Sequence, residues 1–498
     1  MPDHADPSPP TDPPAWPEDA SRPPARTAAD GRLRDTGSPM GALASWAVVV
    51  GMVALIVLSH AMVGSAAPKP ATEPSPTAGV LQIFARYTVG AVETLGAGEQ
   101  RETMLAQLRP TIDAGVASPD DALRASLVAH GLGDDEWARA LLRRITDPGG
   151  PDAEPLLADD PALRPAYIAQ DADRIQTLLD HGVDSLAPDD RSALLDHHGW
   201  FAEFGFTAGA PESDPARRAA VAPAQRTLFA VGALALVGGA GLLAGIVLLI
   251  VMLVKVGNGS VRARYARPAP GGSVYLETFA IFLVGFVGLG LIGEAIRRAT
   301  GVDLSNWLVW LLPLVLLWPV ARGARPVEAK YALGWSRGEG ALTEIGAGLV
   351  GYLAGLPVVA LGFGLTVLIS IVMSGLTGAQ GPPPSHPVVQ QAGAGGVWSV
   401  LSVYLLASVW APIVEESVFR GAFFHHLRGR LGPAASATVV GFVFAIIHPQ
   451  GILLVPPLMA LGFVFSMIRE WRGSIIGPMA AHAVHNAILV TVLLTALS

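Results

Sequence analysis

Nine long apolar runs constrain the fold of this chain more than any other feature. Several of them hold roughly 20 residues, about the length that crosses the hydrocarbon core of a bilayer as an α-helix. The 498-residue composition agrees, with 51% hydrophobic and only 15% charged residues. The sequence therefore predicts an all-α, polytopic membrane protein with about nine transmembrane helices. The runs are Leu43–Val63, Leu228–Val254, Val274–Ile292, Leu304–Ala321, Ile345–Val372, Val397–Leu427, Ala434–His448, Ile452–Ile468 and Ile475–Leu497.

The first apolar run follows a polar leader. Residues 1–40 are rich in Pro, Asp, Ala and Ser, and we expect a disordered cytoplasmic tail because such a segment has little apolar surface to bury. The leader is too long for a signal peptide, and the run 43–63 exceeds the usual length of a signal-peptide core. An uncleaved transmembrane anchor is therefore favoured over a cleaved signal.

An acidic segment separates the first run from the others. Residues 66–226 contain 25 Asp and Glu against 14 Lys and Arg, whereas residues 227–498 contain 9 acidic and 15 basic residues. Apolar residues recur at helical spacing in the acidic segment, for example at Leu123, Leu127 and Val128. We expect residues 65–226 to form a small, acidic α-helical domain, followed by transmembrane helices and basic loops over 227–339.

Local signals mark where helices of this domain begin and end. Ser118 followed by Pro119 is typical of a helix start, with the serine as cap and the proline in the first turn. Three His-Gly pairs, at 130–131, 181–182 and 198–199, are interpreted as helix ends, because glycine readily adopts the left-handed conformation found there. This capping interpretation is favoured over metal binding by the histidines.

The charge of the loops predicts an orientation. If residue 1 is cytoplasmic, the cytoplasmic loops are Lys255–Arg267, Arg322–Arg337, Arg428–Arg430 and Arg469–Arg472, and all four are basic. Cytoplasmic loops carry such an excess of Lys and Arg. Arg297-Arg298 is the one exception among the loops placed outside. The acidic domain then lies outside the cytoplasmic membrane.

Polar residues interrupt the last four apolar runs, where lipid contact costs free energy. Counting about 1.5 Å of rise per helical residue from the basic loops puts Glu415, His448 and His482 at roughly 18, 22 and 14 Å from the same face. Charged groups at such depths are rare and usually functional. The cluster comprises Glu415, Glu416, Arg420, His448, His482 and Asn486.

Helical spacing separates the two adjacent glutamates. Glu416 and Arg420 are four residues apart and can form an ion pair on one face. Glu415 is turned about 100° from Glu416 in an α-helix and can point elsewhere. His482 and Asn486 also share a face.

Three interpretations of the cluster remain open from the residues alone. The polar groups can join helices, since such pairs contribute about 0.6 kcal/mol or more in membranes. They can form an ion or proton path, although the ionisable residues are confined to the C-terminal third and no inverted repeat is evident. They can also hydrolyse an amide, which needs a base for water and donors for an oxyanion. Cysteine is absent, so cysteine nucleophiles and thiolate metal sites are excluded.

Three short motifs resemble those of a known family. "EESVFR" at 415–420, "FAIIH" at 444–448 and "HAVHN" at 482–486 are similar to the EExxxR, FxxxH and HxxxN motifs of the CPBP intramembrane proteases, which include the CAAX prenyl endopeptidases and bacteriocin-processing or immunity-related proteins. The resemblance covers about residues 340–498 and does not extend to the acidic domain.

The resemblance implies a role for each residue of the motifs. Glu415 and His448 would activate water, Glu416 and Arg420 would support the site, and His482 with Asn486 would stabilise the oxyanion. The implied protein is an endopeptidase in the cytoplasmic membrane that acts on a membrane-associated protein or peptide, with no nucleic-acid partner. No cofactor is expected: HExxH spacing is missing, so zinc is possible but not favoured. A non-catalytic scaffold or immunity protein is the alternative.

Overall fold

The computed structural model describes residues 35–65, 78–147, 156, 164–377, 397–448 and 451–497. These residues form helices, turns and loops, and no strand occurs among them. Residues 1–34 of the tail expected over residues 1–40 lie outside the described residues. The chain is an all-α protein, as the sequence predicts.

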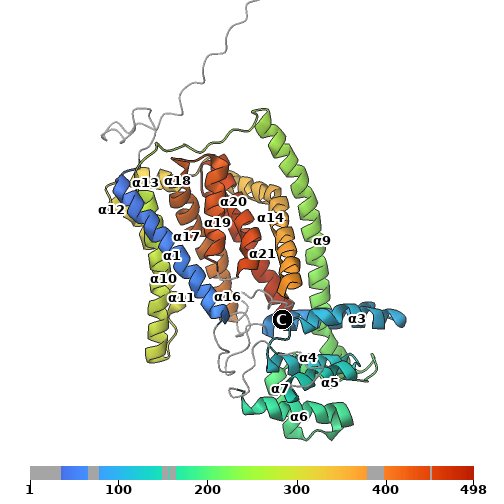
Figure 1. Cartoon of the computed structure of the whole chain (residues 1–498). Coiled ribbons are helices and arrows are strands. Elements are labelled where there is room, and N and C mark those ends of the chain that lie inside the picture. Colours follow the sequence, from blue (N-terminus) through green and yellow to red (C-terminus); the bar gives the residue numbers. More distant parts are fainter. Residues whose placement is uncertain are drawn as a thin grey trace, which may run out of the picture.

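All nine apolar runs are helical, and most lie side by side along one common direction (Figure 1). Six of these helices are long and apolar enough to cross a membrane, and three are shorter. The chain is therefore a multi-pass membrane protein. The helices are α1 (Pro39–Ser65), α9 (Pro215–Gly257), α10 (Val274–Thr300), the short segments α11 (Ser305–Leu308) and α12 (Trp318–Ala321) joined by a 3₁₀ stretch, α14 (Ala341–Thr377), the helix Val397–Arg428, α19 (Pro433–Ile446), α20 (Val455–Arg472) and α21 (Ile476–Leu497).

The outer faces of these helices are apolar and exposed. On α9, Leu236, Val237 and Leu243 expose 76%, 70% and 68% of their surface. Leu361 on α14 exposes 75%. Exposed apolar surface of this extent marks contact with a membrane or a partner. Lipid therefore fits the outside of the bundle.

Glycines let helices of the bundle approach closely. A Cβ on Gly441 of α19 would lie 2.5 Å from the Met459 carbonyl oxygen of α20. The same is true between α14 and α21, where a Cβ on Gly348 would overlap the backbone of Gly477. Small residues at membrane helix contacts permit this close packing. These contacts pack α19 on α20 and α21 on α14, and so position the two histidine motifs at 444–448 and 482–486.

The four basic loops lie together at one end of the bundle. The Arg264 N–H donates to the Trp471 carbonyl at 3.1 Å, and Ile475 N–H donates to Gly334 at 3.0 Å. Arg428 also forms an ion pair with Glu470, at 2.8 Å. The loops that the charge pattern places on one side of the membrane are thus neighbours in space.

The exceptional arginines, Arg297 and Arg298, lie at the other end of α10, near its C-terminus. Both bond to Glu294, at 2.9 and 2.7 Å. The Glu294 carboxylate offsets part of the positive charge of Arg297 and Arg298. The net positive charge at this end of α10 is therefore smaller than the two arginines alone would give.

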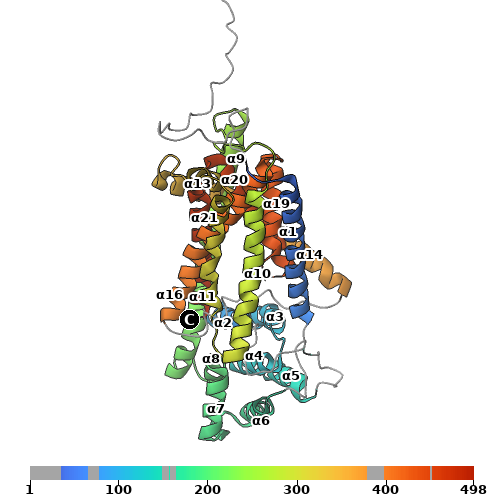
Figure 2. The same cartoon turned by 90° about the vertical axis from the view of Figure 1, so that its left-hand side faces the viewer.

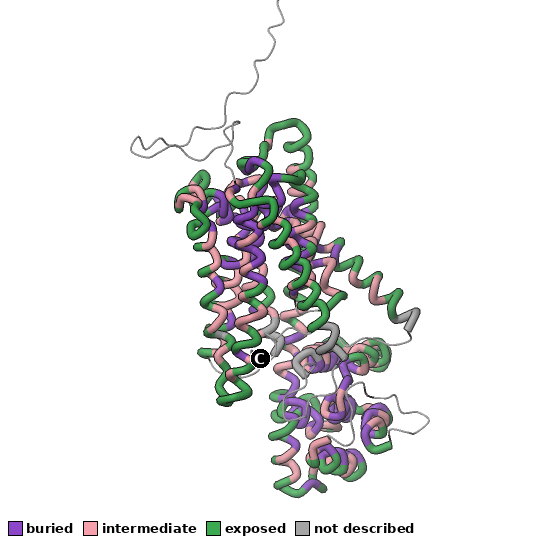
Figure 3. Tube along the Cα trace, turned by 60° about the vertical axis from the view of Figure 1, so that its left-hand side comes forward, coloured by how far each residue is buried: buried purple, intermediate pink, exposed green. Residues whose placement is uncertain are grey.

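The acidic segment folds into a separate cluster of helices at the opposite end from the basic loops (Figures 1 and 2). Its apolar core includes Leu123, Leu127, Val128 and Trp137. Figure 3 shows buried residues inside this cluster and, separately, inside the bundle. The cluster comprises α2 (Ala78–Leu95), α3 (Glu99–Asp113), α4 (Pro119–Gly131), α5 (Asp135–Thr146), α6 (Ala166–His181), α7 (Pro188–His198) and α8 (Trp200–Gly205).

Most of the predicted helix ends in this cluster are confirmed. The Ser118 side chain accepts from the Asp121 N–H, and Pro119 is the first residue of α4. Helices α6 and α7 end at His181 and His198, directly before glycines with φ of 79° and 51°. Helix α4 also ends at the first His-Gly pair, with Gly131 as its last residue. The conformation expected of that glycine is wrong, because Gly133, two residues later, takes the left-handed conformation, with φ of 87°.

Helix α9 connects the cluster to the bundle without a break. Asp214 caps its N-terminus, since this side chain accepts from the backbone N–H groups of Ala216 and Arg217. Ala220 and Ala224 lie in the core of the cluster, whereas the residues after position 228 are largely exposed. The boundary expected between the acidic domain, which ends at residue 226, and the transmembrane region therefore falls inside one continuous helix.

Candidate active site in the bundle

The helix from Val397 to Arg428 changes its winding on both sides of Glu415. It is α-helical over Val397–Leu405 (α16), π-helical over Leu406–Trp410, α-helical over Ala411–Glu415 (α17), π-helical over Glu416–Phe423 and α-helical over Phe424–Arg428 (α18). The expectation of uniform α-helical winding is thus wrong here. π-Helical turns are rare and often occur at functional sites.

Pro412 leaves one backbone carbonyl of the first π-helical turn without a backbone donor. The Ala411 N–H bonds to the Leu406 carbonyl, five residues back. In the same register the next donor would serve Ala407, but Pro412 has no N–H. The Asn486 side-chain amide donates to the Ala407 carbonyl instead, at 2.7 Å. Asn486 therefore fixes α21 against the helix that carries Glu415.

Glu416, Arg420 and His482 form a buried, charged group. Arg420 Nη1 donates to Glu416 Oε1 at 2.9 Å, and both side chains are fully buried. His482 Nδ1 lies 2.9 Å from the same oxygen. Arg420 Nη2 also donates to the Gly462 carbonyl of α20 at 3.1 Å, so the group of Glu416, Arg420 and His482 links three helices. The predicted Glu416–Arg420 pair is thus present.

Aromatic rings enclose this group. The guanidinium carbon of Arg420 lies 4.7 Å from the ring centre of Phe444 and 5.3 Å from that of Phe465. Phe465 also stacks on His482, with ring centres 5.2 Å apart. A cation held over aromatic faces is stabilised when water is excluded. Phe465 lies outside the three motifs, and one more phenylalanine in an apolar run gives no sequence signal for this role.

Phe444 places the two motif histidines near one another. Its ring centre lies 4.5 Å from that of His448 and 6.1 Å from that of His482. The His448 Nδ1 is also 2.5 Å from the Phe444 carbonyl oxygen. A carbonyl only accepts, so Nδ1 carries a proton, and Nε2 is the nitrogen that is basic when the ring is neutral.

Glu415 differs from Glu416 in its surroundings. Its side chain is partly exposed, and its Oε2 atom is buried without a hydrogen-bond partner among the described residues. His482 and Arg420 both lie within electrostatic reach of it. Glu415 is therefore the glutamate whose carboxylate is not committed to the buried ion pair.

Unpaired polar atoms are concentrated around Glu415. Among the described residues, 14 buried side-chain polar atoms have no hydrogen-bond partner, and five of them belong to residues 408–420. Buried polar groups are nearly always paired, so each exception needs an explanation, such as an absent water or a catalytic role. The five atoms are Ser408 Oγ, Trp410 Nε1, Glu415 Oε2, Glu416 Oε2 and Arg420 Nε.

The geometry brings together most of the residues that the sequence singled out. Glu416, Arg420 and His482 are in direct contact, His448 lies beside them across Phe444, and Asn486 bonds Ala407, about two turns before Glu415. The neighbouring His485 turns toward α14, where its Nδ1 lies 2.9 Å from the Tyr352 hydroxyl.

Comparison with known families places this region. Residues 397–488 match the family described as type II CAAX prenyl endopeptidase, Rce1-like. These residues form an Rce1-like domain. The match includes all six predicted site residues and begins at the first residue of α16. A protease-type membrane enzyme follows at the level of the family. No curated protein and no solved structure matches the chain.

Proposed function

We propose that this chain is an integral membrane endopeptidase that hydrolyses a peptide bond of a membrane-associated protein or peptide. The observation that carries the proposal is the group of unpaired, buried polar atoms around Glu415. These atoms lie on the helix with which the Rce1-like domain begins; Glu415 lies between two π-helical turns, and the other four residues lie within them.

Glu415 is the general base in this proposal. Its ionised carboxylate accepts a proton from water while the water oxygen attacks the carbonyl carbon of the scissile bond. His448 holds the same water through Nε2, because its Nδ1 is engaged by the Phe444 carbonyl. The attack gives a tetrahedral intermediate with negative charge on the former carbonyl oxygen.

His482 and Asn486 stabilise that oxyanion. Glu416 accepts the Nδ1–H of His482, and the protonated form of this imidazole donates its Nε2–H to the oxyanion. Asn486 uses one amide hydrogen for Ala407 and keeps a second for the oxyanion.

The leaving amine takes its proton from Glu415. When the intermediate collapses, the carbon–nitrogen bond breaks and the proton that Glu415 removed from water passes to the amine nitrogen. Glu415 thereby returns to its ionised state. Glu416 and Arg420 position His482 and do not exchange protons with the substrate.

Zinc-dependent hydrolysis is a separate hypothesis with its own test. Among the described residues of the bundle, no three carboxylate or imidazole atoms converge as metal ligands would. Purified protein treated with a chelator separates the two hypotheses. We expect peptide cleavage to persist after dialysis against a chelator, whereas a zinc mechanism requires loss of cleavage and its return with added Zn²⁺.

Processing of membrane proteins in cells tests the proposal. We expect cells with Glu415→Gln or His448→Ala to accumulate uncleaved forms of the same membrane proteins. Glu294→Gln is the matched control, because that glutamate lies on the exposed face of α10. A non-catalytic scaffold instead predicts that Glu415→Gln behaves like the wild type in cells.

A further inference from the structure

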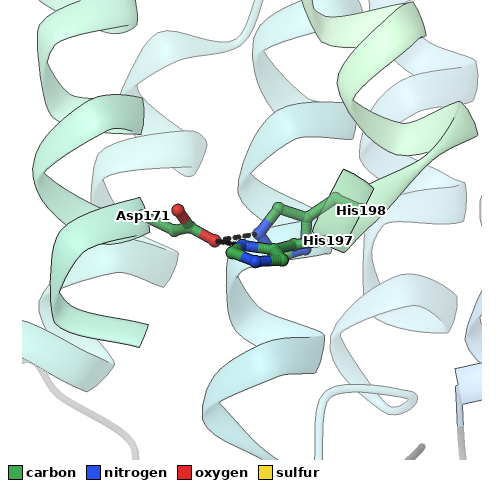
Figure 4. A group of neighbouring side chains, drawn as sticks. All are labelled: Asp171, His197 and His198. Atoms are coloured by element: carbon green, nitrogen blue, oxygen red, sulfur yellow. Dashed lines mark hydrogen bonds and ion pairs between the residues drawn. The ribbon is translucent and has the colours of Figure 1, made fainter. Parts of the chain in front are cut away.

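The helical cluster contains a second group of polar side chains, far from the site in the bundle along the chain. Helix α6 contributes Asp171, and the last turn of α7 contributes His197 and His198 (Figure 4). His197 Nδ1 lies 2.6 Å from Asp171 Oδ2, and His198 Nε2 lies 3.1 Å from the same oxygen. One ligand atom from each residue lies within 4.8 Å of the other two.

The spacing of these atoms fits a shared metal ion. Zn²⁺ binds imidazole nitrogen and carboxylate oxygen at about 2.0–2.2 Å, so two ligand atoms of a tetrahedral site lie about 3.3–3.6 Å apart. The two Asp–His distances, 2.6 and 3.1 Å, are shorter, so both contacts widen when an ion enters between the atoms. His197 and His198 are adjacent in the sequence, yet both can reach one ion, because His197 would bind it through Nδ1 and His198 through Nε2.

A second carboxylate supports His198 from behind. Asp120 Oδ1 lies 3.6 Å from His198 Nδ1, the nitrogen that faces away from Asp171. Both atoms are buried, and neither has a hydrogen-bond partner among the described residues. Histidine ligands commonly donate their other N–H to a carboxylate, which fixes the ring and strengthens the ligand. The arrangement Asp120–His198–metal follows that pattern, and a small movement would close the hydrogen bond.

The charges around Asp171 keep it available as an anionic ligand. Arg174 Nη1 binds the other carboxylate oxygen, Oδ1, at 2.6 Å. Oδ2 is thus the oxygen that can serve one ion with both histidines.

Access is possible from one side of the group. The side chains of Asp171 and His198 are fully buried, whereas that of His197 is 36% exposed. An ion could therefore enter past His197 and keep a coordination position open to water or another ligand. The helix-ending role of His198-Gly199 does not conflict with this, since Gly199 shapes the backbone and the imidazoles supply the ligands.

We propose that Asp171, His197 and His198 bind one divalent transition-metal ion, with Asp120 orienting His198. Two imidazoles and one carboxylate suit Zn²⁺, Fe²⁺, Co²⁺ or Ni²⁺ better than Mg²⁺ or Ca²⁺, which prefer oxygen ligands. The ion joins α6 to α7 and belongs to the helical cluster, so its binding is independent of the proposed proteolysis.

Metal content of the full-length protein tests this proposal. The chain is purified in detergent, stripped with a chelator, equilibrated with micromolar Zn²⁺ and freed of unbound metal before elemental analysis. We expect His197→Ala to retain one Zn²⁺ per chain fewer than the wild type. His181→Ala is the matched control, because this exposed histidine ends α6, the helix of Asp171, but is not one of the proposed ligands. We expect this variant to bind as much Zn²⁺ as the wild type does.

Two further measurements keep the outcome decisive. Co²⁺ should give visible absorption bands in the wild type that are missing in His197→Ala, and added Zn²⁺ should raise the Tm of the wild type but not of that variant. Equal Tm values without metal would show that His197→Ala still folds, and His197→Gln provides a second variant if they differ. Equal Zn²⁺ content in the wild type and a folded His197 variant would overturn the proposal.

Discussion

The buried guanidinium of Arg420 is the side chain on which the geometry of the bundle site depends most. It binds Glu416, which in turn holds His482, and it donates to the Gly462 carbonyl of α20. Arg420 therefore joins its own helix to α20 directly and to α21 through Glu416 and His482. Removing the cation would leave the Glu416 carboxylate buried with one partner fewer.

Arg420→Ala is accordingly expected to destabilise the protein strongly. Removing one partner of a buried ion pair costs about 3–5 kcal/mol, because the other charge stays buried. Arg298→Ala is the control, since that arginine is 77% exposed and its pair with Glu294 contributes at most about 1 kcal/mol. Thermal unfolding in detergent measures both. A Tm of Arg420→Ala as high as that of Arg298→Ala would contradict a structural role for the buried pair.

Residue spacing predicted part of this site. The Glu416–Arg420 pair follows from a separation of four residues, and the structure contains it. The contact between His482 and Glu416 could not be predicted, because it depends on how α21 is rotated against the preceding helix. The bond from Asn486 to Ala407 depends on a carbonyl left without its donor by Pro412, which requires knowledge of the π-helical register.

At the scale of helices, close packing of α19 on α20 positions the site. Gly441 and Gly462 face each other, and Gly462 also supplies the carbonyl that Arg420 binds. Substituting Gly441 by alanine would force the two backbones apart. The π-helical turns around Glu415 are the element that sequence periodicity missed, since a one-residue change in register leaves the apolar pattern of a buried helix almost unaltered.

Gly441→Ala is expected to lower stability by about 1–3 kcal/mol, the usual cost of overpacking a tight contact. Gly239→Ala on α9 offers a control, because a Cβ there meets nothing within 4 Å. Alanine also favours a helix over glycine, so the control should be neutral or slightly stabilising. Unfolding curves of the two variants that coincide would argue against a close α19–α20 contact.

The whole molecule has two different ends. The basic loops gather at one end of the bundle, and the acidic helical cluster lies at the other, joined through the long helix α9 (Figure 1). The number of apolar helices and the grouping of the basic loops follow from hydropathy and charge, which are summed over many residues. The continuity of α9 does not, because its polar first turns and apolar remainder look like two segments in the sequence.

Single cysteines test the proposed orientation, and the natural chain contains none. Ser185→Cys lies in the helical cluster, and Gly432→Cys lies in the basic loop before α19. In intact cells, a membrane-impermeant thiol reagent should label the first from outside and the second only after the membrane is opened. Labelling of both from the same side would refute the arrangement.

Cleavage of a substrate peptide by purified protein tests the central claim most directly. Once processing in cells has identified a substrate, its cleavage is measured with the wild type, Glu415→Gln and the control Glu294→Gln. General-base catalysis contributes about 10²–10⁴-fold, so Glu415→Gln should lose at least about 100-fold in kcat while Glu294→Gln cleaves at the wild-type rate. Equal rates for Glu415→Gln and the wild type would contradict the account.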